Sequence, residues 1–443
     1  MSSRLDRAVA DAILGLDTLF GGDVTNPSGT GRFIADAWFS DVPLPAAYTV
    51  PAAAAVRATG GVSAPDPDRA AIDAYLAAID LPAAIAGVEA GAREVGGLRG
   101  RYLEGLAFSC QVMWELVLEL TGRGEPVPYR RAVEASCGTP PTPSRPETKR
   151  EQAAALLESA GYGGELGAAV ERWRGERLVP RKSIKALADA FIAQLDAATA
   201  RHLLPYLPES LHGVPRANVA FLPIENAWFS GSMNYLGRAR RADGSPQYEA
   251  TYELNASLEI SVPEFVQLVS HEVVPGHVTT FAFLQHLHHL GEIGFEASVP
   301  TMNTRQATLA EGIANNAILM AHGVTEIAQL GDPDLELGLL LALLQDDAKN
   351  QASWLTWQEG WPQAEVAAVL RRDYLVSEER ADKLSGAWGR HPLLGRMYLP
   401  CYRAGTEKVA ELRRRMPPGR LLPALYGACG LVDIVTLDDV LAG

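Results

Sequence analysis

One heptapeptide decides how the chain folds around its candidate site: His271-Glu272-Val273-Val274-Pro275-Gly276-His277. It follows a capping box at Ser261–Glu264, with proline in the first turn, which predicts that a helix begins there. The histidines are six residues apart, about 240° in a regular helix, so the second imidazole would face away from the first. Pro275 cannot donate a helix hydrogen bond, and Gly276 tolerates unusual dihedral angles. We therefore predict a break between Val274 and His277 that turns His277 back toward His271.

The residue types in this stretch indicate a catalytic metal. Two neutral imidazoles and a later carboxylate are a common ligand set for catalytic zinc, with the fourth position left for water. A glutamate beside the first histidine can serve as the general base for that water. We therefore interpret His271 and His277 as Zn²⁺ ligands and Glu272 as the catalytic base.

The pattern His-Glu-x-x-Pro-Gly-His resembles the signature of the bacterial domain-of-unknown-function 885 family, whose members are similar to gluzincin zinc metallopeptidases. The resemblance covers roughly residues 215–415. A Glu-Gly-Trp-Ala segment follows in that family, and its glutamate is the third ligand. Glu311-Gly312-Ile313-Ala314 matches that segment, so the resemblance implies Glu311 as the third ligand. Glu359-Gly360-Trp361 is a literal competitor, but it lies farther along and precedes Pro362.

A second family segment, Tyr-x-x-Gly-x-x-Lys, is matched by Tyr402, Gly405 and Lys408. The resemblance implies that Tyr402 or Lys408 stabilises the oxyanion that develops on the substrate carbonyl. Gly405, one turn on from Tyr402, would let its helix approach the site closely. The chain also departs from the family around the ligands, which marks it as a divergent member. The departures that we note are Val278, Thr280, Ile313, Asn315, Asn316 and Ile318.

Helical periodicity recurs over most of the chain, and we expect a mainly α fold with a multi-helix, gluzincin-like architecture. The expected helical stretches lie within 68–122 and at about 145–160, 164–176, 181–205, 304–323, 334–357, 362–372, 377–388 and 393–415. Residues 22–66 are rich in Pro, Gly and Ala, and they predict an irregular segment at the surface.

A small β hairpin or sheet is expected directly before the zinc-binding helix. Val219–Leu222 and Tyr248–Leu254 read as short strands, and Asp243–Pro246 is a good turn between them. The edge of such a sheet can hold an extended substrate by backbone hydrogen bonds.

The chain has 443 residues, enough for several domains or for one large domain with a cleft. A Pro-rich break at 138–143 suggests a division into an N-terminal segment and helical sub-domain (1–140), a helical connecting region (141–215) and a catalytic zinc-binding region (216–443). One continuous domain is the alternative.

The composition excludes some partners. A formal net charge of −14 argues against a nucleic-acid partner, because phosphate contacts need a basic surface. No run of residues reaches the ~18 apolar residues of a membrane span, and the N-terminus lacks a secretion signal. Four scattered cysteines make a disulfide framework or a thiolate metal site improbable. We expect a cytoplasmic protein.

Three functions remain open at this point. The first is a zinc-dependent hydrolase of peptide or amide bonds. The second keeps the zinc but cleaves an amide or ester of a small metabolite. The third is a helical binding or scaffold protein with a catalytically silent site, although a silent site does not need Glu272.

Overall fold

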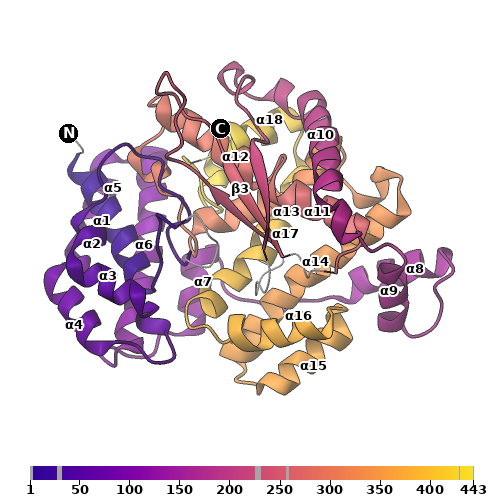
Figure 1. Ribbon diagram of the computed structural model, residues 1–443, viewed down its shortest axis with the longest axis horizontal. Helices are drawn as coiled ribbons and strands as arrows, with labels where there is room; N and C mark the ends of the chain where they lie inside the picture. The colour runs from indigo at the N-terminus through magenta and orange to yellow at the C-terminus, as the bar shows by residue number, and fades with distance from the viewer. Residues whose placement is uncertain (1–2, 27–31, 225–230, 256–258, 429, 443) are drawn as a thin grey trace.

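The computed structural model describes residues 3–26, 32–224, 231–255, 259–428 and 430–442. The chain is mainly helical with a small mixed sheet, which confirms the predicted fold class. The N-terminal helices occupy the left of the molecule in Figure 1, and the sheet lies near its centre. The helices that precede the sheet are α1 (Arg4–Leu19), α2 (Ala46–Thr49), α3 (Pro51–Ala58), α4 (Arg69–Ala78), α5 (Leu81–Val95), α6 (Gly97–Leu120), α7 (Tyr129–Cys137), α8 (Glu147–Ser159), α9 (Leu166–Gly175) and α10 (Ile184–His202).

The sheet is followed by a second series of helices, which surround it and continue toward the bottom of Figure 1. They are α11 (Val262–Glu272), α12 (His277–His289), α13 (Arg305–His322), α14 (Pro333–Ser353), α15 (Gln363–Tyr374), α16 (Glu378–Lys383), α17 (Leu399–Arg415), α18 (Pro418–Leu422) and α19 (Leu437–Ala442). Two of these helices illustrate how a side-chain cap sets the start: Thr304 accepts from the amide of Ala307 before α13, and Asp332 accepts from the amide of Leu335 before α14.

The sheet has the strand order β1-β3-β2, with β1 at Val219–Ile224, β2 at Gly231–Tyr235 and β3 at Ala250–Asn255. β1 pairs with β3 in parallel, from Val219 opposite Ala250 to Ile224 opposite Asn255. β2 pairs with β3 antiparallel, from Gly231 opposite Leu254 to Tyr235 opposite Ala250. β2 is therefore an edge strand.

This arrangement corrects the predicted hairpin. The two predicted strands are β1 and β3, but they run parallel, so they cannot be the arms of a hairpin. The antiparallel partner of β3 is β2, and the Asp243–Pro246 turn lies between those two strands. β2 gave no strand signal because Gly231 and Asn234 have low strand propensity.

The expectation for residues 22–66 is also corrected. Two helices, α2 and α3, lie inside this segment, and all residues of the stretch 34–39 except Asp36 are buried instead of lying on the surface. Ala35 forms an isolated antiparallel bridge with Thr301, and the amides of Ile34 and Ala35 donate to the buried Asp17 carboxylate. These bonds satisfy the backbone of an irregular segment, which lets it pass through the interior.

Hydrophobic side chains gather in several clusters. One cluster holds the sheet with α10–α13, and another is built mostly from α1–α7. The division at 140 and 215 stays a prediction. Among the described residues, no single helix is long and apolar enough to cross a membrane, whereas the bent pair α4 and α5 passes that test together by length and composition alone.

Candidate metal centre

The helix that carries His271 breaks where the sequence predicts. α11 begins at Val262 with Ser261 as its cap and ends at Glu272, and α12 begins at His277. A Cβ at Gly276 would lie 1.7 Å from the carbonyl oxygen of His271, so only glycine fits between the two helix ends. The break lets the start of α12 return over the end of α11, and this brings His277 beside His271.

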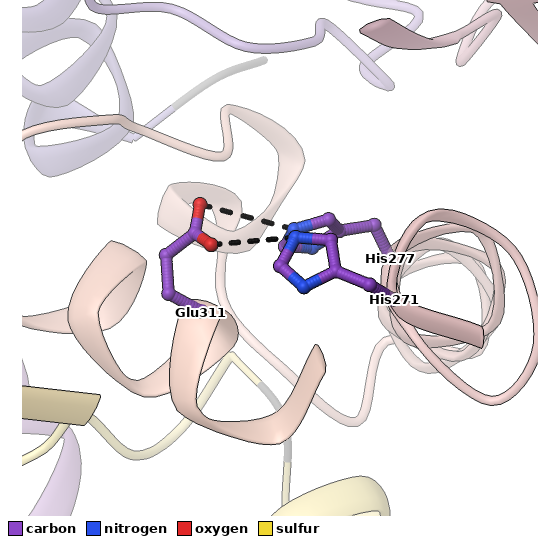
Figure 2. A group of neighbouring side chains, drawn as sticks. All are labelled: His271, His277 and Glu311. Atoms are coloured by element: carbon purple, nitrogen blue, oxygen red, sulfur yellow. Dashed lines mark ion pairs between the residues drawn. The ribbon is translucent and has the colours of Figure 1, made fainter. Parts of the chain in front are cut away.

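The three predicted ligands come together. Figure 2 shows Glu311, from α13, reaching toward the two imidazoles. Its oxygens lie 3.5 Å from His271 Nε2 and 3.8 Å from His277 Nε2, and the ring centroids are 4.8 Å apart. The three side chains form a group that could hold a metal ion, with candidate ligand atoms within 4.8 Å of one another. Tetrahedral ligands about 2.1 Å from zinc lie about 3.4 Å apart, so the side chains would draw together on binding the ion.

The donor set itself fits a metal. Tyr398 donates to Glu311 Oε1 at 2.7 Å, whereas Glu311 Oε2 is buried without a hydrogen-bond partner. Buried carboxylate oxygens without a partner are uncommon, because the lost hydration must be replaced. A cation between Glu311 and the two histidines would supply the missing interaction.

Asn315 fixes the orientation of His271. Its Oδ1 accepts from His271 Nδ1 at 2.7 Å, and its own Nδ2 donates to Thr406 Oγ1 at 2.8 Å. This bond places the proton on Nδ1 and leaves the lone pair of Nε2 directed at Glu311. Asn315 is one turn after Glu311 on α13, so both act from the same helix face.

The two histidines titrate differently. Burial lowers the pKa of His271 to about 3, and the neighbouring His277 adds to this effect. Burial also acts against the charged form of His277, but the nearby carboxylates of Glu311 and Glu272 outweigh burial and raise the pKa of His277 to about 9. His271 is thus neutral at pH 7, as a metal ligand must be, while His277 would release its proton on binding a metal.

The two carboxylates are also separated in acidity. Burial raises the pKa of Glu272 to about 7, only partly opposed by His277. Burial acts in the same sense on Glu311, but the charge of the neighbouring His277 imidazole, helped by His271, outweighs burial and lowers the pKa of Glu311 to about 2. Glu311 is therefore a permanent anion suited to ligation, and Glu272 is a carboxyl group able to exchange a proton near neutral pH.

Two glycines bring α17 against α13 beside the ligands. A Cβ at Gly405 would lie 2.0 Å from the carbonyl oxygen of Thr308, and one at Gly312 would lie 2.4 Å from that of Gly405. The close approach predicted for Gly405 is therefore present. It places Tyr402 on the wall of the same pocket as Glu311, with the ring of Tyr398 5.2 Å away.

Two other residues considered from the sequence lie elsewhere. Lys408 Nζ donates to both oxygens of Asp438 at 2.7 Å, and its side chain is not among those lining the pocket. Lys408 comes six residues after Tyr402 on α17. Six residues turn a regular helix by about 240°, so Lys408 faces away from the pocket wall that holds Tyr402. Glu359 is exposed at the end of a π turn, away from the ligands.

The pocket has a volume of ≈ 150 Å³ and includes a wall that the sequence did not reveal. Arg32 and Asp36 form an ion pair there, and Arg32 also donates to Ser232 of β2. Residues Gly231–Met233 complete this wall. The edge strand thus lies beside the candidate metal ligands.

Two of the additional site residues could have been identified from sequence spacing, and two could not. Asn315 and Tyr398 stand one helical turn from Glu311 and Tyr402, so spacing alone could have selected them. Arg32 and Asp36 come from an irregular segment more than two hundred residues away in the chain, and only the fold brings them to the site.

The comparisons with solved structures show the fold. A protein from Colwellia psychrerythraea described as a lipoprotein aligns with a TM-score of 0.54 and 13% identity, over 84% of this chain and 71% of that one. A protein of unknown function from Shewanella oneidensis, also described as a lipoprotein, aligns with a TM-score of 0.51 and 11% identity, over 91% and 80%. No family model and no curated protein matches the sequence. The resemblance to the domain-of-unknown-function 885 family therefore stays a prediction.

Proposed function

We propose that this protein is a zinc-dependent hydrolase that cleaves peptide or amide bonds. The observation that carries the proposal is Glu272, a carboxyl group only 14% exposed, with its pKa raised to about 7, adjacent to the group His271, His277 and Glu311. When bound, a zinc ion would polarise the scissile carbonyl and make an attacking water more acidic. A purely structural metal site has no use for such a base.

The outer edge of β2 favours a substrate in extended conformation. The amide of Leu236 donates to the carbonyl of Glu249. In an antiparallel pair every second residue directs its backbone N–H and C=O toward the partner strand, so the backbone groups of Ser232 and Asn234 also face β3. The backbone groups of Met233 and Tyr235 then face the outer edge, where the described chain offers them no backbone partner. A peptide added along this edge would lay its backbone across the pocket.

The chain's own side chains then perform the proton transfers. Glu272 accepts a proton as water attacks the carbonyl carbon, and it returns that proton to the nitrogen as the C–N bond breaks. Tyr402, on the pocket wall, supplies a hydroxyl donor for the oxygen on which negative charge develops. Lys408 has no place in this scheme, because it is held at Asp438.

A small-metabolite amide or ester is the second candidate, and the modest volume of the pocket, ≈ 150 Å³, favours it over a large side chain at the reacting centre. A silent binding or scaffold protein is the third candidate. A screen of blocked short peptides against acylated metabolites separates the first two.

Two variants test the proposal side by side. Glu272→Gln keeps the shape of the side chain but cannot take a proton, so it should retain zinc and lose ~10²–10⁴-fold in turnover. Glu311→Gln should lose zinc affinity first and turnover as a consequence. The measurements are zinc content and turnover on a substrate from the screen. Equal turnover of Glu272→Gln and the unmodified protein would exclude Glu272 as the base, and no turnover by any zinc-loaded form would favour the silent scaffold.

We retain the cytoplasm as the proposed location and expect neither a nucleic-acid nor a membrane partner. The two similar structures are described as lipoproteins, which makes the cell envelope the alternative. Fractionation of cells that express the protein distinguishes the two locations.

A further inference from the structure

A second cavity lies beside the metal pocket and shares Arg32 and Asp36 with it. Its volume is ≈ 240 Å³, whereas a single water needs about 10–15 Å³, so it can hold a group of several heavy atoms. β2 joins the two cavities: Gly231–Met233 line the metal pocket, and Asn234 and Tyr235 line the second cavity. A ligand extended along β2 would pass from one to the other within two strand residues, about 7 Å.

Three residues on the wall of this cavity have buried polar atoms without a hydrogen-bond partner. Asn234 is 3% exposed, and neither its Nδ2 nor its Oδ1 has a hydrogen-bond partner. Trp38 Nε1 and Arg32 Nε are likewise buried and unpaired. Buried polar groups nearly always have a partner, so their gathering around one cavity points to a ligand that supplies it. The terminal amide torsion of asparagine is soft, which lets Asn234 turn toward such a ligand.

The chemistry of these atoms selects an anion. The indole of Trp38, the Nε–H of Arg32 and the amide of Asn234 are donors, and Asn234 Oδ1 is the single acceptor among them. The charged side chains around the cavity are Arg32, Arg238 and Asp36, an excess of one positive charge. A carboxylate, which only accepts hydrogen bonds, matches both features. An ammonium group would meet one unpaired acceptor and several donors.

We propose that the second cavity is a subsite for a carboxylate of the substrate, held by Asn234, Trp38 and Arg32. The proposal rests on the proposed function in one respect, since it takes the two cavities as parts of one substrate site along β2. The carboxylate is either the C-terminal α-carboxylate of a peptide or an acidic side chain, because both present the same two oxygens.

Calorimetric titration of blocked peptides tests the subsite. The full-length, zinc-loaded Glu272→Gln variant is used, so that the probes are not consumed. The neutral probe is acetyl-tetra-alanine amide, one acidic probe is acetyl-tetra-alanine with a free carboxylate, and the others carry glutamate at each position of the blocked amide in turn. We expect at least one acidic probe to bind about tenfold tighter than the neutral amide, the effect of one charge-assisted hydrogen bond. The probe that does so identifies the source of the carboxylate.

Variants in the same background locate the preference. Trp38→Phe removes the indole donor and keeps an aromatic ring beside Phe295, and Asn234→Leu replaces an unpaired amide by an apolar side chain of the same branched shape. Each should reduce the acidic preference severalfold. Thr199→Val is the matched control, because it also removes a buried, unpaired polar atom but lies on α10 outside both cavities. If Asn234→Leu fails to fold, Trp38→Phe alone decides.

Two outcomes overturn the subsite: acidic probes that bind no tighter than the neutral amide, or a preference that the Trp38 and Asn234 variants leave unchanged. A preference that vanishes when the metal is chelated, and ignores those variants, would mean that the carboxylate binds the metal itself. Hydrolysis without any acidic preference would leave the proposed function standing and remove the subsite. If the acidic preference depends on Asn234 but the protein hydrolyses no substrate, the subsite stands and the proposed function is removed.

Discussion

Asn315 shows how a single side chain outside the ligand set governs the candidate metal centre. Its Oδ1 holds the Nδ1–H of His271, and its Nδ2 is anchored on Thr406 of α17. The proton on Nδ1 keeps Nε2 free, and the anchor keeps the imidazole plane directed at Glu311. An orienting partner of this kind contributes to metal affinity without touching the metal.

The corresponding prediction concerns Asn315→Leu, which keeps the branched shape of the side chain and removes the hydrogen bond. We expect about a 10- to 100-fold loss of zinc affinity, as for other partners that orient a metal ligand. Competition with a fluorescent zinc chelator measures it. Asn350→Leu, a change at an asparagine that bonds the 142–144 segment instead of the site, serves as the control. An unchanged zinc affinity in Asn315→Leu would mean that the bond does not orient His271.

Asp17 is a buried carboxyl group that makes stability depend on pH. Burial raises its pKa to about 7 from an ordinary 3.8, although the amides of Ala35 and Ile34 act to lower it. Between these pH values the folded state binds more protons than the unfolded state, so stability falls as pH rises from about 4 to about 7. The loss amounts to at most about 4 kcal/mol and stays constant above that range.

Asp17→Asn should remove this dependence, because the amide oxygen can still accept both backbone bonds without a charge. We expect the variant to match the unmodified protein near pH 4 and to be more stable by a few kcal/mol at pH 8. Urea unfolding at both pH values measures the difference. Asp382→Asn, at an exposed position, should show no such pH-dependent gain. A gain of equal size at pH 4 and pH 8 would contradict the raised pKa.

At the scale of elements, the site depends on two close approaches that glycine permits. Gly276 lets the start of α12 lie on the carbonyl of His271, and Gly312 and Gly405 let α13 and α17 touch by their backbones. Both could be predicted from the sequence. A Pro-Gly pair between two candidate ligands indicates a helix break, and a glycine one turn after a candidate catalytic tyrosine indicates a close helix approach. The consequence is that ligand spacing is set by helix packing as well as by side chains.

Gly405→Ala tests this dependence. The new Cβ would lie 2.0 Å from the carbonyl oxygen of Thr308, so the helices must separate. We expect a loss of stability of about 1–3 kcal/mol and, in the folded fraction, weaker zinc binding. Thermal melting and zinc content measure the two effects. Gly175→Ala, at the end of α9 with no atom within 4 Å of the new Cβ, should be neutral or slightly stabilising. Equal behaviour of the two variants would show that the helix crossing tolerates a methyl group.

The elements that the sequence did not predict share a physical cause. β2 is five residues long and rich in residues with low strand propensity, so its strand conformation comes from pairing with β3. Residues 34–39 have no periodicity and are ordered by bonds to Asp17 and to the 298–302 stretch. Local sequence signals helices and turns, but it does not signal a segment whose order comes from partners distant in the chain.

At the scale of the whole molecule, the candidate centre joins parts of the chain that fold around different cores. The candidate ligands stand on α11, α12 and α13, and another part of the pocket wall comes from Arg32 and Asp36 in the N-terminal part. Without a cation, the anionic Glu311 and the buried Glu272 lie together at low solvent exposure. A bound metal would therefore favour the assembled arrangement over any opened one, since it binds only where the three ligands meet.

The last prediction follows from this coupling. Zinc at about 1,000 times its dissociation constant should stabilise the protein by about 4 kcal/mol, so the melting temperature should fall by several degrees on chelation. Differential scanning calorimetry with zinc and with excess chelator measures the shift. His277→Ala should melt at one temperature under both conditions, because a ligand is missing. His289→Ala, on the same helix but exposed, should keep the full shift. If the unmodified protein melted identically with and without zinc, or if His277→Ala kept the zinc-dependent shift, the ion would not be bound by the three ligands that we assign.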